Sequence, residues 1–223
     1  MKKIIFILIT TFFMVGCRSY NAFDHLPNAN LQKKLPTIDL EFDSESFATL
    51  TGFSTNTISG TTYSLSGIST LGIFAGQSKS YTSKSLNDIK SIYNQNMYKN
   101  IVSKYGTKKG KVVCRLVTGN EKLSDWGMTV LSGVTLFIPN LLGLPIASCT
   151  TEMVVELNFY NLKNELIASY QSDNYRVKKW YALYWGHSDP SGISKTEAFK
   201  LCIADLNKQI ENHYYILNEL LDE

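Results

Sequence analysis

Three short stretches hold the residue types that could do chemistry in this sequence. Cys17 ends an apolar run and offers a thiolate, the best side-chain nucleophile for alkylation near neutral pH. GHSDPSG at 186–192 places His, Ser and Asp side by side, the residue types that hydrolases use. WYALYW at 180–185 offers rigid aromatic side chains of the kind that anchor binding partners. Each stretch has to be judged by the elements around it.

The segment before Cys17 has the features of a secretory signal peptide. Lys2 and Lys3 give it a positive start, and an apolar run follows from Ile4 to Val15. A helix needs roughly 20 apolar residues to cross a bilayer, so this run is too short to remain as a transmembrane anchor. We therefore expect residues 1–16 to be a signal peptide that is removed.

The cleavage site itself is more specific. Met14-Val15-Gly16-Cys17 resembles the lipobox of bacterial lipoproteins. The resemblance implies that the Cys17 sulfur receives a diacylglycerol, that the chain is cut before Cys17, and that the new amine is acylated by a fatty acid such as palmitate. Arg18 follows where an Asp would favour the inner membrane. The resemblance thus implies a lipid-anchored protein of the cell envelope, in the outer membrane and facing the periplasm.

Composition excludes one class of partner. Lys2 and Lys3 are two of the 22 basic residues, so a chain that begins at Cys17 keeps 20 basic and 19 acidic residues. Because proteins bind nucleic acid mainly through Lys and Arg contacts to phosphates, such a balance argues against a nucleic-acid partner. The sequence also lacks the Gly-rich motifs that cradle phosphates or dinucleotides, so we expect no cofactor.

The other cysteines do not indicate a metal site. Cys114, Cys149 and Cys202 are an odd number of thiols, so at least one is unpaired or intermolecular in an oxidising compartment. Cys114 alternates with apolar residues, and Cys202 falls on an apolar helical stripe, which favours buried free thiols over a disulfide. No CxxC motif and no Cys/His ligand spacing occurs, so we expect no metal.

GHSDPSG is better explained as a turn than as an active site. Adjacent side chains point apart, whereas a catalytic triad is assembled from separated segments. A Ser/Asp/Pro turn that introduces the last helix accounts for the same residues. We therefore assign no catalytic residue and expect a protein that is not an enzyme, with an envelope hydrolase as an alternative.

The chain divides into a tether and one domain. Residues 17–36 contain Pro27, Pro36 and several Asn, with little periodicity, and are predicted to lift the domain off the membrane. Residues 37–223 are predicted to form a single α/β domain. Within it, residues 51–85 are rich in Ser, Thr and Gly, which favours a surface excursion, with a hairpin of an oligomeric pore as the alternative.

Hydrophobic periodicity predicts the elements of that domain. Apolar residues at helical spacing run from Leu86 to Ile101, and KVVCRLV at 111–117 alternates as a strand. Alternating runs at 151–160 and 165–177 flank NLKN and predict an antiparallel hairpin. A capping box at Ser194 begins a long apolar stripe. The expected fold is α+β, a mostly antiparallel sheet packed by two principal amphipathic helices, with the Ser/Thr/Gly-rich excursion.

Residues 127–147 are the most apolar part of the chain after the signal peptide. Pro139 and Pro145 interrupt them, so they cannot span a bilayer. We expect a short helix or extended segment that covers the sheet. The alternative is that they dip into the headgroup region of the membrane that holds Cys17.

The order of these patterns suggests a second resemblance. LSGVTL followed by Pro, then the hairpin, the aromatic stretch ending at Gly186 and the amphipathic last helix resemble small envelope lipoproteins of undefined function. Over roughly residues 85–210 they are distantly similar to the α/β core of the curli-secretion lipoprotein. The resemblance carries no catalytic residues.

The aromatic run has two interpretations. Its side chains pack against strand neighbours, or one face stays open and binds a glycan or protein partner, in which case the candidate residues are Trp180, Tyr181, Tyr184 and Trp185. The sequence therefore predicts a membrane-anchored envelope lipoprotein that acts as a non-enzymatic interaction or accessory component of an envelope assembly. Its partner would be another envelope protein or a second copy. Besides the hydrolase, the alternative is a carrier of an apolar ligand beneath residues 127–147.

Overall fold

The computed structural model describes the domain and the last part of the expected tether. The described residues are 20–29, 31, 33–48, 50, 85–124, 126–135, 138–141, 143–182, 186, 187 and 189–222. The signal peptide, Cys17 and nearly all of the predicted Ser/Thr/Gly-rich excursion lie outside them. Predictions for those segments therefore remain predictions.

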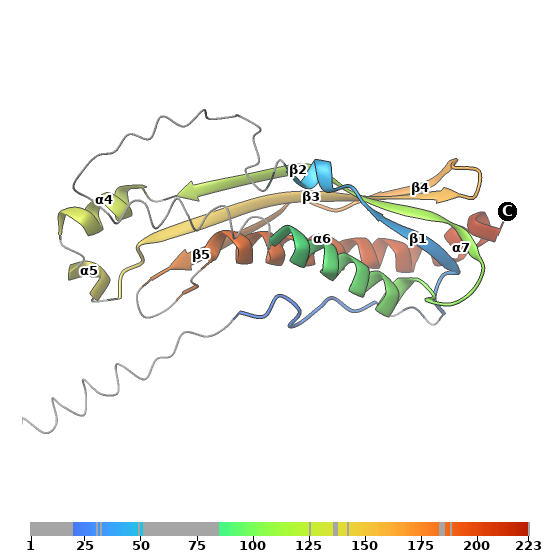
Figure 1. Cartoon of the computed structure of the whole chain (residues 1–223), viewed down its shortest axis with the longest axis horizontal. Helices are drawn as coiled ribbons and strands as arrows, with labels where there is room; N and C mark the ends of the chain where they lie inside the picture. The colour runs from blue at the N-terminus through green and yellow to red at the C-terminus, as the bar shows by residue number, and fades with distance from the viewer. Residues whose placement is uncertain are drawn as a thin grey trace, which may run out of the picture.

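A five-stranded, mostly antiparallel sheet forms the centre of the fold (Figure 1). The long strands β2 (Lys108–Ser124) and β3 (Ala147–Asn161) pair antiparallel along almost their whole length. β1 (Thr37–Phe42) pairs parallel with β2 and is followed by the short helix α2 (Ser44–Ala48). Alternating apolar residues put one side of β2 into the core, as the sequence predicted, but the strand is far longer than 111–117.

The far edge of β3 is shared by two short strands. β4 (Leu166–Gln171) pairs with the second half of β3, and β5 (Tyr175–Tyr181) pairs with the first half. Between them Ser172 bonds twice to Val155, through its backbone N–H at 2.9 Å and through its hydroxyl at 3.0 Å. The predicted hairpin is confirmed, but its second run is split into β4 and β5. Ser172 lies between these two strands and supplies the hydrogen bonds that the Val155 backbone on β3 needs there.

One face of the sheet is covered by helices (Figure 1). Residues 85–96 form a helix that continues into the π-helical turn η1 (Met97–Ile101), as the spacing predicted. The second helix is α6 (Pro190–Asn212), followed by α7 (Tyr214–Asp222). Tyr93, Phe159 and Phe199 are fully buried between these helices and the sheet. The expected α+β fold with two principal helices is therefore confirmed.

The opposite face of the sheet carries ion pairs. They join β1 or the residue after it to β2, and β5 to β3, at N–O distances of 2.6–3.9 Å: Lys108–Asp39, Lys111–Glu41, Arg115–Asp43 and Arg176–Glu152. Their side chains are largely exposed, so each pair adds little stability. They keep this face polar, which suits a two-layer fold with helices on one side only.

The last helix begins earlier than its capping box predicted. Asp189 is the N-cap of α6, because its carboxylate accepts a hydrogen bond of 2.8 Å from the Gly192 N–H and Pro190 occupies the first helical position. Ser194 lies inside the helix, where its hydroxyl donates to the Ser191 carbonyl. The prediction of a start at Ser194 was wrong because two capping patterns lie within a few residues of each other.

Part of the expected tether packs onto the domain. Ala22 and Leu35 are buried in the main core, and the side-chain amides of Asn96 and Asn100 both donate to the Pro27 carbonyl. The chain from Tyr20 onward therefore lies across the helical layer (Figure 1) and does not form a free spacer up to residue 36.

Residues 127–147 form two short helices at one end of the molecule (Figure 1). They are α4 (Trp126–Val134) and α5 (Ile138–Leu141), and Ile146 then bonds to the Tyr181 carbonyl before β3 begins. The prediction of short helical structure is confirmed. No helix in the described parts of the chain is both long and apolar enough to cross a membrane.

Candidate functional site

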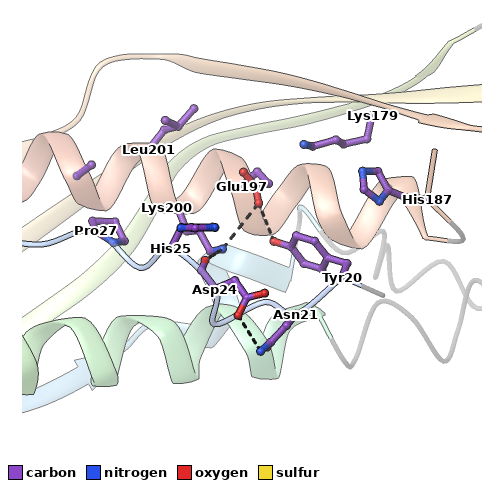
Figure 2. Close-up of a pocket in the computed structure, with 11 residues that line it drawn as sticks. Tyr20, Asn21, Asp24, His25, Pro27, Lys179, His187, Glu197, Lys200 and Leu201 are labelled. Carbon is purple, nitrogen blue, oxygen red and sulfur yellow. Dashed lines mark hydrogen bonds and ion pairs between the residues drawn. The ribbon is translucent and has the colours of Figure 1, made fainter. Parts of the chain in front are cut away.

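Tyr20, the first described residue, is hydrogen-bonded to α6. The Tyr20 hydroxyl donates to Glu197 at 3.0 Å, and Lys200, one turn further along α6, donates to the Asp24 carbonyl at 2.7 Å. Lys200 also lies 3.7 Å from Glu197, and its side chain is only 8% exposed. Burial, followed by the nearby Glu197 carboxylate, raises the pKa of Tyr20 well above its usual value. These contacts hold the segment from Tyr20 to Asp24 on α6 (Figure 2).

A hollow of about 520 Å³ opens beside Tyr20. Charged and polar side chains from the N-terminal segment, β5 and α6 make up most of its lining, and Figure 2 shows Lys179 and His187 on its far side from Asn21. The His187 ring meets the Tyr20 ring edge-on, with centroids 6.2 Å apart. Two acids of the lining already have partners, since Glu197 lies 3.7 Å from Lys200 and Asp24 accepts a hydrogen bond from the Asn21 amide. Two histidines, His25 and His187, also line the hollow.

A second polar cluster is buried where α6 meets the sheet. Glu121 on β2 forms an ion pair of 2.8 Å with Lys195, whose side chain is 1% exposed. The same carboxylate accepts hydrogen bonds from Ser191 and, at 3.2 Å, from the Cys149 thiol. Thr151 and Ser194 are also hydrogen-bonded to each other, at 2.7 Å. Each charge is therefore compensated, as burial requires.

The electrostatics of this cluster oppose nucleophilic chemistry. Burial and the Glu121 carboxylate raise the pKa of the Cys149 thiol to about 12, so its thiolate is not formed near neutral pH. Burial alone would raise the pKa of Glu121, but Lys195 and its hydrogen bonds hold that pKa below its usual range. Sequence reasoning missed this cluster, because Glu121 and Lys195 are far apart in the chain and only the fold joins them.

GHSDPSG does not assemble a hydrolytic site among the residues described. Asp189 caps α6, Ser191 bonds to Glu121, and His187 lies against Tyr20. Ser188 is outside the described residues. The arrangement agrees with a turn that introduces the last helix.

The aromatic candidates do not form one platform. Trp180 pairs with Ser148 and Tyr181 with Ala147 across β3, so their side chains point to opposite faces of the sheet. The Lys178 ammonium lies 3.9 Å from the centre of the Trp180 ring on the polar face. Both aromatics are half-buried, whereas Tyr184 and Trp185 lie outside the described residues. Of the two described, only Trp180 lies on the face that is not covered by α6.

The expected free thiols are confirmed for all three cysteines of the domain. Cys114, Cys149 and Cys202 are buried and form no disulfide. Burial also raises the pKa of Cys202, to about 11. Within the part of the chain that the structure describes, no group of three or more His, Cys, Asp or Glu side chains is placed to hold a metal ion.

The described surface also has an apolar end. Side chains of α4, α5 and the turn after them are 42–78% exposed, although the sequence predicted that this segment covers the sheet: Val130, Leu131, Val134, Ile138, Leu141 and Leu144. We call these six residues the α4–α5 apolar face.

Comparisons with known proteins give only a distant likeness to solved structures. No protein-family model matches the chain, and no curated protein matches it. Among solved structures, the chain is similar to a minor lipoprotein from Acinetobacter baumannii, with 11% identity, a TM-score of 0.27, and coverage of 82% of this chain and 90% of that one. At this TM-score the likeness decides neither the fold nor the function of this chain.

Proposed function

We propose that the protein is a lipid-anchored lipoprotein of the cell envelope, attached through Cys17, that acts as a non-enzymatic interaction or accessory component of an envelope assembly. The observation that carries the proposal is the position of Tyr20. It follows Cys17 by three residues and is hydrogen-bonded to α6. Because three residues span at most about 11 Å, a lipid on Cys17 would hold the folded domain directly at the bilayer surface.

The lipobox-like residues and the chemistry of acylation support the anchor. A single acyl chain binds a bilayer only marginally, whereas two or three chains on one residue make a stable anchor. Arg18 in place of an Asp favours the outer membrane and the periplasmic side. The anchored chain then needs no membrane-spanning element.

The interaction role is supported by the buried polar cluster around Glu121, whose groups are already paired or protonated. Glu121 and Lys195 neutralise each other, and the Cys149 thiol stays protonated, so this buried cluster serves the fold. Trp180 on the polar face of the sheet is the described aromatic best placed for an envelope protein partner or a second copy.

Site-specific photo-cross-linking in intact cells tests the interaction role. A photo-reactive residue in place of Trp180 is expected to cross-link to one envelope protein or to a second copy. The control is Tyr215, which is 80% exposed on α7 at the other end of α6 and is expected to give no such product. Equal, diffuse labelling from both positions would contradict a specific partner at Trp180.

A further inference from the structure

The α4–α5 apolar face gathers six exposed apolar side chains on two short consecutive helices and the turn after them. Single exposed apolar side chains are normal, but a contiguous apolar patch marks a site of interaction. Here six exposed apolar side chains fall within residues 130–144, and Val134 is 78% exposed. From Trp126 to Thr151 the chain contains no Asp, Glu, Lys, Arg or His. Nothing charged within this segment opposes its transfer into an apolar medium.

Lysines stand where this uncharged segment joins the sheet. Thr150, near the start of β3, pairs with Lys122 on β2 and with Lys178 on β5, and the neighbouring Cys149 pairs with Lys179. Lys122 and Lys179 form no ion pair with another described residue. The α4–α5 apolar face would lie among acyl chains, and the lysines next to it would lie among the anionic phosphates above those chains. This is the arrangement of a protein segment at a bilayer surface.

A series of contacts connects the start of the described chain to this end of the molecule. Tyr20 contacts His187, whose N–H bonds to the Trp180 carbonyl at 2.9 Å. The carbonyl of Tyr181, the next residue, accepts a hydrogen bond from the N–H of Ile146, five residues after the end of α5. A short series of contacts therefore connects the residue nearest Cys17 to the base of α5. With about 11 Å of chain between Tyr20 and Cys17, a bilayer that holds Cys17 comes close to this end of the molecule.

We propose that the α4–α5 apolar face lies in the headgroup and outer acyl region of the bilayer to which Cys17 is attached, with Lys122, Lys178 and Lys179 at the level of the phosphates. This inference rests on the proposed function, because the anchor brings the bilayer to this end. A second copy fits the face less well. In a two-fold dimer the same patch meets itself, so the lysines of the two copies would be brought together, whereas phosphates attract them.

The test measures the depth of one labelled residue in the full, processed chain. Val134→Cys accepts an environment-sensitive fluorophore, while the three described native thiols are buried and Cys17 carries the lipid. The control is Leu162→Cys, 68% exposed in the turn after β3. The two labels lie on segments that flank opposite ends of β3, a strand whose 15 residues span about 50 Å. The proteins are reconstituted into vesicles of phosphatidylethanolamine with a minority of phosphatidylglycerol, and flotation with the vesicles reports attachment independently of depth.

The expected result separates the two labels. At Val134 the emission shifts to the blue, quenching by lipids with brominated chains is strong, and quenching by aqueous iodide is largely lost. At Leu162 iodide quenches and brominated lipid does not. If the protein floats and both labels are equally accessible to iodide, the docked face is overturned and the anchor stands. Protection of Val134 from both quenchers would assign the face to a second copy instead. A protein that does not float and keeps Met1 overturns the proposed function itself.

Discussion

At the scale of single residues, the Glu121–Lys195 pair is the most consequential polar contact described. Lys195 is buried by the packing of α6 on the sheet, and its ammonium would be an uncompensated charge without Glu121. Ser191 and Cys149 occupy further positions around the same carboxylate. The pair fixes how the start of α6 meets β2, which is also the end of the molecule that bears the α4–α5 apolar face.

The Glu121→Gln variant is expected to lose about 3 kcal/mol of unfolding free energy, because Lys195 is left buried without its counter-charge. Urea unfolding of the purified protein measures the loss. The matched control is Glu152→Gln. Glu152 lies 3.5 Å from Arg176, whose side chain is largely exposed, so this variant is expected to lose about 0.5 kcal/mol or less. Similar losses for both variants would show that the Glu121–Lys195 pair is not specially important.

The same carboxylate predicts a pH dependence. Lys195 holds the pKa of Glu121 in the folded protein below the reference value of 4.5, so the contribution of Glu121 to stability is complete above pH 4.5. It is lost as the pH falls through the lower, folded-state pKa, because Glu121 then binds a proton. The stability difference between the wild type and Glu121→Gln should therefore be largest above pH 4.5 and shrink below it. A difference that stays constant down to acid unfolding would contradict the role of the ionised carboxylate.

At the scale of elements, the close pairing of β2 and β3 depends on Gly110. A Cβ added there would lie 2.1 Å from the Tyr160 carbonyl oxygen, so Gly110→Ala must push the strands apart and is expected to cost about 2 kcal/mol. Gly133 in α4 is the matched control, because an added Cβ meets nothing within 4 Å. Gly133→Ala should stabilise by about 0.5 kcal/mol, since Ala is the better helix former. Thermal unfolding of both variants checks the signs, and equal effects would contradict the register.

The elements that the sequence predicted well are those specified locally. The helix from Leu86 to Ile101 and the turn at Asn161–Asn164 follow from spacing and turn residues within a few positions. The start of α6 was misplaced because Ser194 and Asp189 both have capping patterns, and only the fold shows that the Ser194 hydroxyl is used by Ser191 and Thr151.

The parts that the sequence could not supply are the contacts between distant segments. The bonds of Tyr20 to Glu197 and of Glu121 to Lys195 have no local signature, because each joins residues that only the packing of α6 brings together. The exposure of a side chain also depends on contacts with distant segments. The apolar run at 127–147 was visible in the sequence, but whether it covers the sheet or faces outward depends on what packs against it.

At the scale of the whole molecule, an elongated sheet separates two different ends (Figure 1). One end bears α4 and α5, and the other bears the β3–β4 turn and α7, while the described chain starts beside α6, between the two ends (Figure 1). A bilayer at the first end leaves the far end accessible to envelope partners. Trp180 lies closer to α5 than Lys178 does, so a partner at Trp180 would have to lie in or at the same membrane. We propose that function comes from orientation at a membrane surface, with the modification of Cys17 as the anchoring step.

Intact-mass analysis of the protein purified from its native membrane tests that claim most directly. The account predicts a chain that begins at Cys17 and carries the added mass of a diacylglyceryl group, with a further acyl chain on the amine. An unmodified chain that still begins at Met1 would contradict it.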